Sequence, residues 1–341
     1  MSGTFSSRTY NFNTLLGRSS FPDYSVKKVV VPRFQRGYSW KKVHVATFWE
    51  DVIAFHSRTD KLLDSQTYFL GPIVILIDQS LRSVDFAAAS AKECESYTDI
   101  LNIGDSVPKA SRPFIDALMN KLSSERALPV LLSGLRCLKE NDFERLSRSV
   151  VALVVRHSLI ANLNPADLEA TLYDTAREIR KLHKKRKRSP EIVNKARALL
   201  QKINPTTHQI REGIAELYLD KPTAQYLLRE IADKMQSKSK GVTSGRTSIE
   251  HIFPRNAAKA DWPNAAHLEP YVWHIGNLTL LEPKQNKDVG NKGFADKSNK
   301  YPQSELQMTK QVAEKFRAWD EKAITTRAQN MVSYIDQIWT V

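Results

Sequence analysis

Two short stretches near the end of the chain decide its architecture: Ser248-Ile249-Glu250-His251-Ile252-Phe253-Pro254 and, further along, His274-Ile275-Gly276-Asn277-Leu278-Thr279-Leu280-Leu281. The first is typical of a short strand that delivers an acid and a histidine side by side before Pro254 stops it. The second is typical of a strand opened by a Gly-Asn turn. A polar helix or loop follows. The order predicts a hairpin followed by a helix.

The residue types in this order match what phosphodiester hydrolysis requires. A neutral histidine can take a proton from water near pH 7, which predicts His251 as the base. A hard divalent cation, Mg²⁺ or Mn²⁺, would neutralise the phosphate charge with one or two protein oxygens and several waters. Glu250 and Asn286 are the predicted ligands. The sequence therefore predicts an HNH, or ββα-metal, nuclease site.

Further residues around the hairpin complete the predicted site. Asn277 would tie the hairpin together through its side-chain amide and aim His251, and His274 would be a further ligand or a phosphate contact. We group both with His251 as catalytic candidates. The residues predicted to hold the DNA backbone without reading bases are Arg255, Lys284, Lys287, Asn291, Lys292 and Lys297.

Each of these residues also has an ordinary structural interpretation. A lone Glu-His pair is usually surface polarity, Gly-Asn is usually a turn, and the asparagines could be helix caps. The ordered set favours a site, because every member would have to be coincidental at once. A zinc site built from His251, His267 and His274 lacks cysteines and the usual ligand spacing.

Composition indicates the class of partner. Lys and Arg outnumber Asp and Glu 51 to 37 over 341 residues, a formal charge of +14 and a pI near 9.6, which favours a polyanion such as nucleic acid. Two cysteines are too few for a disulfide framework, and the first residues lack the apolar region of a secretory signal. We expect a cytoplasmic, prokaryotic protein. The longest apolar runs are too short to span a bilayer, so no membrane partner is expected.

The patterns along the chain predict an α+β, mostly helical fold in three parts. Residues 1–95 are a small α/β unit, with strands at Ser25–Val31 and Thr67–Ile77 around an amphipathic helix at Lys42–His56. Residues 96–240 are a central helical bundle. Residues 241–341 are the nuclease domain with closing helices.

The helical periodicity of the middle part runs from Ser111 to Lys238. Its clearest predicted helices are Asp167–Lys181, His208–Tyr218 and Thr223–Met235, with Thr206 and Thr207 as N-cap candidates. A basic run at residues 180–188 lies between two of its helices. That run is either a contact for phosphate backbones or a solvated helix end, and the sequence favours neither.

A family resemblance rests on the two quoted stretches together with Asn286, Asn291, Phe294, Lys297 and Tyr301. They resemble the C-terminal nuclease domain of the GmrSD-type modification-dependent, or type IV, restriction enzymes, in which the histidine is catalytic. The late segment Thr325 to Trp339, with Arg327, resembles the closing segment of that family.

The N-terminus resembles the same family. Val31-Pro32-Arg33-Phe34-Gln35-Arg36-Gly37-Tyr38-Ser39-Trp40 is similar to its ParB-like opening, which implies nucleotide binding through Gln35 and Arg36. The chain departs from the family after Asp85, where Phe86-Ala87-Ala88-Ala89-Ser90 stands in place of Gly-Gln-Gln-Arg, so the nucleotide-hydrolysing part is shortened.

The resemblance implies a metal-dependent DNA endonuclease that cuts foreign or modified phage DNA in defence. It also leaves room for a homo-oligomer or a full-length homologue as partner. The alternative, favoured by the missing motif, is a catalytically inactive DNA-binding or assembly subunit of such a restriction system.

Overall fold

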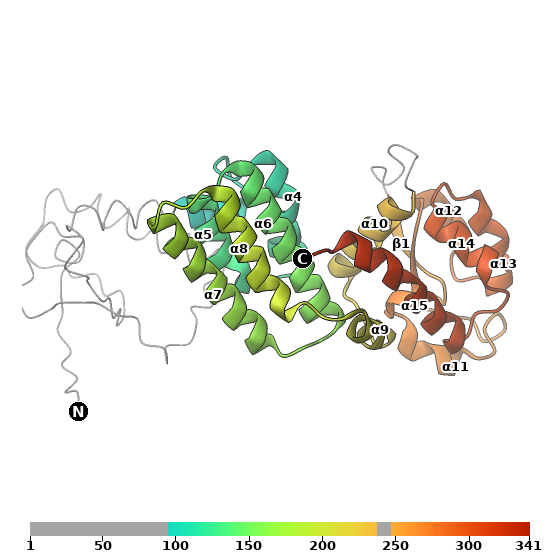
Figure 1. The fold of residues 1–341 in the computed structure, drawn as a ribbon. Coiled ribbons are helices and arrows are strands. Elements are labelled where there is room, and N and C mark those ends of the chain that lie inside the picture. The colour runs from blue at the N-terminus through green and yellow to red at the C-terminus, as the bar shows by residue number, and fades with distance from the viewer. Residues whose placement is uncertain (1–94, 237–246) are drawn as a thin grey trace, which may run out of the picture. The chain divides into compact units, whose positions relative to one another are not determined.

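The structure, a computed structural model, describes residues 95–236 and 247–341 (Figure 1). Within these residues the chain is mostly helical, with few strands, which confirms the predicted fold class at that level. Residues 102–341 form one compact unit. Several predictions lie outside the described residues, namely the N-terminal strands and helix, Gln35 and Arg36.

The first part of this unit consists of helices. The α-helices are α4 (Arg112–Asp116), α5 (Leu128–Cys137), α6 (Glu140–Leu153), α7 (Pro165–Lys184) and α8 (Ser189–Leu200). Two π-helical segments, η2 (Ala117–Lys121) and η4 (Val154–Ile160), continue α4 and α6, and the 3₁₀ turns are η1 (Lys109–Ser111), η3 (Glu125–Ala127) and η5 (Gln201–Ile203). α7 packs against both α5 and α8, and α6 packs against α8.

The sequence explains where α7 begins and which face it buries. Asn164 caps the helix by accepting a hydrogen bond from the Ala166 backbone N–H, and Pro165 occupies the first position, where its missing N–H costs nothing. Leu168, Leu172 and Ile179 then recur on one face and are fully buried. The predicted helix Asp167–Lys181 is thereby confirmed with slightly wider bounds.

Two further helices connect this part to the C-terminal part. They are α9 (Thr207–Ala215) and α10 (Lys221–Met235), and both pack against the last helix. Thr206 and Gln209 form a reciprocal capping box at the start of α9, which confirms the N-cap predicted there. Asp220 caps α10 by accepting from the Thr223 backbone N–H.

The C-terminal part is built around a two-stranded antiparallel sheet. β1 (Ser248–His251) pairs with β2 (Leu278–Leu281), with Glu250 opposite Thr279 and His251 opposite Leu278. The helices are α11 (Ala265–Leu268), α12 (Pro283–Val289), α13 (Phe294–Lys300), α14 (Gln307–Lys315) and α15 (Glu321–Ile338), with 3₁₀ turns η6 (Glu269–Tyr271), η7 (Ile275–Asn277) and η8 (Tyr301–Gln303).

The hairpin is held from several sides. α10 and α14 contact β2, α12 contacts β1, and α15 packs against η7. Large aromatic side chains, among them Trp262, Tyr301 and Trp319, fill the core beside it. The second strand is shorter than the quoted stretch, because Ile275–Asn277 forms the 3₁₀ turn η7. No helix in the described ranges is long and apolar enough to cross a bilayer.

Candidate active site

His251 stands at the end of β1 with its two ring nitrogens in different environments. Nδ1 lies 2.9 Å from the Val272 carbonyl oxygen, and a carbonyl can only accept, so Nδ1 carries the proton. Nε2 is then the basic nitrogen, and it makes no hydrogen bond to any described residue. The ring also meets the edge of Trp273, with 4.7 Å between centroids. This is the arrangement that a general base requires.

The surroundings of His251 keep its ring neutral. Burial lowers the pKa of His251 below its ordinary 6.5, and the positive charges of Arg255 and Lys297 lower it further, against the opposing effect of the bond to Val272. A histidine with a lowered pKa is ready to accept a proton at pH 7.

Asn277 ties together the two segments that frame His251. Its Oδ1 accepts from the Phe253 backbone N–H (2.8 Å) and from Trp319 Nε1 (3.0 Å). Its Nδ2 donates to the Phe253 carbonyl (3.0 Å) and to the Val272 carbonyl (3.2 Å), the same oxygen that holds His251. The predicted tie is present. Asn277 shares the Val272 carbonyl oxygen with His251 and, being fully buried, does not reach solvent.

His274 does not fit the predicted role of a ligand or phosphate contact. It is fully buried, its Nε2 lies 2.9 Å from the Ala215 carbonyl, and its Nδ1 accepts from the Gly276 backbone N–H. Both nitrogens are therefore engaged. The bond between His274 Nδ1 and the Gly276 N–H caps the η7 turn. At the same turn, a Cβ on Gly276 would lie 2.1 Å from the Ile324 carbonyl oxygen. Only glycine permits this approach of α15.

Glu250 and Lys297 also lie elsewhere than predicted. Lys297 Nζ donates to Glu250 Oε1 at 2.7 Å and to the His251 carbonyl at 2.8 Å, and Tyr301 Oη donates to Glu250 Oε1 at 3.0 Å. The Lys297 side chain is 0% exposed, so its ammonium cannot meet a DNA backbone from this position. Burial raises the pKa of Glu250 and lowers that of Lys297, and the two charges compensate each other.

Glu250, one of the two predicted metal ligands, does not fit a cation beside His251. Neighbouring residues in a strand point to opposite faces, so Glu250 leaves β1 on the side away from His251, where Lys297 already matches its charge. Asn286 turns its amide nitrogen to β1 and donates to Ser248 Oγ and the Ile249 carbonyl. In the part of the chain that the structure describes, no three His, Cys, Asp or Glu side chains are grouped to hold a metal. Metal dependence stays a prediction.

The other predicted DNA contacts are on the surface. Arg255, just after β1, is exposed, and its guanidinium lies 6.0 Å from the Trp273 ring centre, next to His251. The remaining exposed candidates lie on or just after α12, and they are Lys284, Lys287, Asn291 and Lys292. Their role on phosphate stays a prediction.

Two partners of the site were missed by the sequence analysis. One is the Val272 carbonyl, because a backbone oxygen has no signature in sequence. The other is Trp319, whose indole N–H bonds Asn277 from 42 residues away. An isolated buried tryptophan has a donor that needs a partner, and that requirement was the available signal.

Two family models match the chain. The one described as GmrSD restriction endonucleases, C-terminal domain, covers residues 208–334, and the one described as GmrSD restriction endonuclease, N-terminal domain, covers residues 20–103. A search of curated proteins returns no match. Residues 104–207, which we call the intervening segment, lie outside both matches.

Proposed function

We propose that this chain, which belongs to the GmrSD restriction endonuclease family, cuts the DNA backbone with water activated at His251 Nε2. The observation that carries the proposal is the pair of nitrogens on His251, one fixed by the Val272 carbonyl and the other left to accept a proton. Family membership supports a restriction nuclease with DNA as its substrate. The HNH chemistry, the metal and the kind of DNA belong to our proposal.

In the proposed reaction, a water oxygen attacks phosphorus while His251 Nε2 takes a proton from that water. The bond between phosphorus and the 3′-oxygen breaks, and the leaving oxygen collects a proton from solvent. Arg255, exposed beside Trp273, supplies positive charge near the phosphate. We propose foreign or phage DNA with modified bases as the substrate, because the family resemblance implies it. We also propose Mg²⁺ or Mn²⁺ dependence, because a divalent cation would neutralise the charge on the phosphate.

The test is cleavage by the purified full chain and its His251→Ala variant. Plasmid and phage DNA, with and without modified cytosine, would be incubated with Mg²⁺, Mn²⁺ or a chelator, with and without nucleotide. We expect the variant to lose cleavage by about 10²-fold to 10⁴-fold, the usual contribution of a general base. His267→Ala is the matched control, because His267 is exposed on α11 and contacts none of the site residues described above. Cleavage that survives in His251→Ala would overturn the proposal.

The enclosed position of Glu250 favours the second candidate, a subunit that binds DNA without cutting it. In that case the carboxylate next to His251 in sequence serves the fold alone. The same assay separates the two candidates. Nicking that depends on His251 supports the nuclease, and retardation of DNA without cleavage under every metal condition supports the binding subunit.

A further inference from the structure

The intervening segment carries most of the excess positive charge of the chain. Residues 104–207 contain 20 Lys and Arg against 11 Asp and Glu, a net charge of +9 out of +14. Seven of the 20 cations lie in the run 180–188. Without that run, 13 cations against 11 acids would leave the segment at +2. The excess positive charge of the intervening segment is therefore concentrated in the run 180–188.

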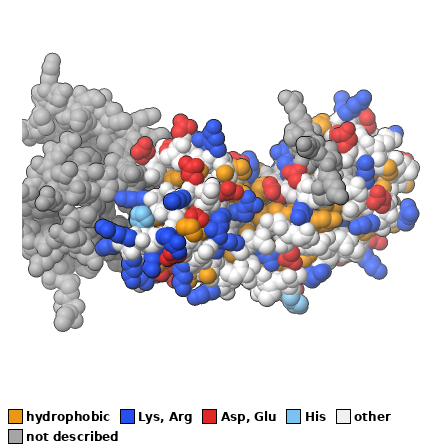
Figure 2. All heavy atoms as spheres, turned by 45° about the horizontal axis from the view of Figure 1, so that its top comes forward, with side chains coloured by type: hydrophobic (Ala, Val, Ile, Leu, Met, Phe, Trp, Pro, Cys, Tyr) orange, Lys and Arg blue, Asp and Glu red, His pale blue; other side chains and the backbone are white. Residues whose placement is uncertain are grey.

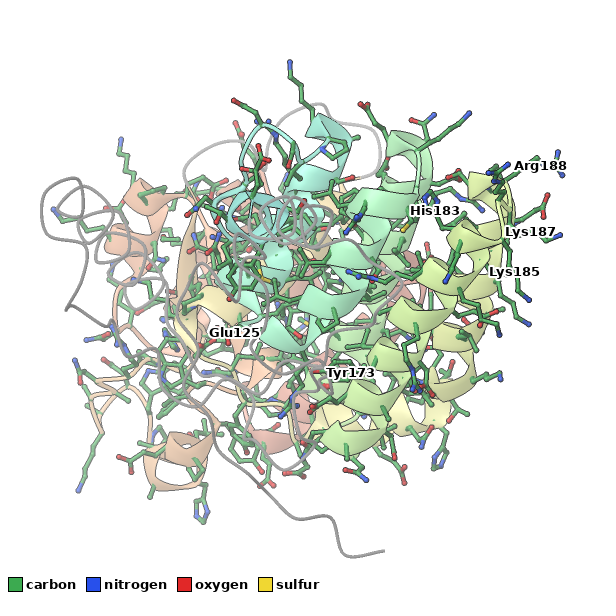
Figure 3. All side chains as sticks on the ribbon, turned by 90° about the vertical axis from the view of Figure 1, so that its left-hand side faces the viewer. Glu125, Tyr173, His183, Lys185, Lys187 and Arg188 are labelled. Atoms are coloured by element: carbon green, nitrogen blue, oxygen red, sulfur yellow. The ribbon has the colours of Figure 1, made fainter. Side chains whose placement is uncertain are left out.

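The fold places this run at one end of the helices. It covers the last turn of α7 and the connection to α8, and residues 183–188 are all exposed. Figure 3 shows Lys185, Lys187 and Arg188 extending outward from this end, and Figure 2 shows how densely basic side chains cover the helical part. The exposed Lys139, the residue before α6, lies beside this connection, because its backbone N–H donates to Ser189 Oγ at 2.9 Å. We call Lys139 and residues 184–188 the basic tip.

The fold uses only part of this charge. Lys187 and Arg188 both pair with Glu191. Lys184, Lys185 and Arg186 have no ion pair or side-chain hydrogen bond with any described residue, and Arg186 has a backbone φ of 57°, in the left-handed region. One or two cations satisfy the C-terminal end of a helix dipole, and that interaction is weak. Three adjacent unpaired cations repel one another, so the fold does not account for them.

We propose that the basic tip binds the sugar-phosphate backbone of double-stranded DNA, at a second contact separate from His251. The identification of DNA as the polyanion rests on the proposed function. Positive side chains without aromatic neighbours fit phosphate better than bases, because base stacking needs exposed rings. The exposed Tyr173 lies on α7, 12 residues before Lys185. At roughly 1.5 Å per residue this is about 18 Å along the helix axis, which is too far for its ring to reach a base beside the tip (Figure 3). The contact is therefore independent of sequence.

The experiment compares two triple variants of the full chain in DNA retardation across a salt series. The tip variant is Lys184→Gln, Lys185→Gln and Arg186→Gln. The control, Lys109→Gln, Lys202→Gln and Lys221→Gln, removes three exposed cations elsewhere. Each lost phosphate contact lowers the slope of log affinity against log salt by about 0.9. We expect a slope lower by about 2 to 3 and affinity about 10-fold weaker for the tip variant, against a slope change under about 1 for the control.

Either of two results would overturn the proposal: a tip variant that binds like the parent chain, or a control variant that weakens binding equally. The thermal transition should stay the same or rise, because the replaced side chains have no partner. His251→Ala should retain the full salt slope, so a failed nuclease proposal and a failed tip proposal give different results.

Discussion

The two faces of the β1–β2 hairpin differ in what solvent can reach. On one face His251 has a nitrogen fixed by the Val272 carbonyl and another that accepts no bond from a described residue. On the other, Glu250 is enclosed with Lys297 and Tyr301. The acid and the histidine are adjacent in sequence, but strand alternation separates them. The difference teaches that one residue of the motif is available for the proposed chemistry while its neighbour holds the strand in place.

The largest expected effect comes from opening the closed face. Lys297→Met leaves the Glu250 carboxylate buried without a cation, and we expect the free energy of unfolding to fall by about 3–5 kcal/mol. Urea denaturation measures the loss. The double variant Glu250→Gln with Lys297→Met should lose less, because no buried charge remains. Lys292→Met, at an exposed site, is the control. A cost below about 1 kcal/mol for Lys297→Met would place its ammonium at the surface instead.

A second effect concerns Asn277, which ties together the two segments that frame His251. Asn277→Ala leaves the Phe253 N–H and carbonyl and the Trp319 N–H without their partner, and we expect a loss of about 3 kcal/mol. Cleavage per folded molecule should also fall, because the Val272 carbonyl loses a donor that helps to position it. Asn286→Ala, with two bonds at a half-buried site, should cost about 1 kcal/mol. Equal costs would contradict the positioning role.

The third prediction compares the replacement of each of the two histidines, His251 and His274, by leucine. His274→Leu removes the bonds to Ala215 and Gly276 and should lower stability by about 2 kcal/mol, with cleavage by the folded fraction retained. His251→Leu should do the reverse and abolish cleavage with little change in stability. Thermal unfolding and nicking assays on both variants measure the two effects. A His274→Leu protein that folds but does not cut would return His274 to the catalytic group.

The smallest effect is a shift in pH dependence. Since burial lowers the pKa of His251 below 6.5, the base stays neutral and cleavage should persist below pH 6.5, until pH falls through the lowered pKa. Arg255→Gln removes one cause of that lowering, so the acid limb of the pH–rate profile should move to higher pH. An unmoved limb would show that the titrating group is another residue.

The free energy of unfolding should also fall as pH drops through the lowered pKa of His251. A histidine whose folded pKa is lowered binds its proton more readily in the unfolded state, so its contribution is present above pH 6.5 and lost as pH falls. His157 and His274 have lowered pKa values for the same main reason, burial, and should add to the loss. Urea midpoints measured from pH 7.5 down to 5.5 would check it.

Local patterns predicted the local parts of this fold well. Helical periodicity over Asp167–Lys181 predicted α7, and Thr206 and Thr207 as N-cap candidates predicted the start of α9. His251 could be singled out because an acid–His pair before proline is followed by Gly-Asn-Leu. These signals lie within a few residues of each other, where sequence and structure are most directly related.

The contacts that decide the roles of the site residues join distant parts of the chain. Glu250 meets Lys297 across 47 residues, and His274 meets Ala215 across 59. Both depend on how helices pack on the hairpin, which residue spacing does not encode. For that reason Glu250, Lys297 and His274 were predicted at the surface of the site, although packing places them inside the protein.

The buried Arg156 limits how this protein can be divided. Its guanidinium, extending from the π-helical segment η4, donates to Asn204, to the Pro205 carbonyl and, at 2.6 Å, to Asp336 near the end of α15. The intervening segment thus supplies a cation to Asp336 on α15, two residues past the end of the family-matched region. A gene fragment that begins at residue 208 would leave Asp336 without this cation. The segment therefore contributes to the packing of the C-terminal part, and Asp336 is the first residue to replace in a chain shortened at residue 208.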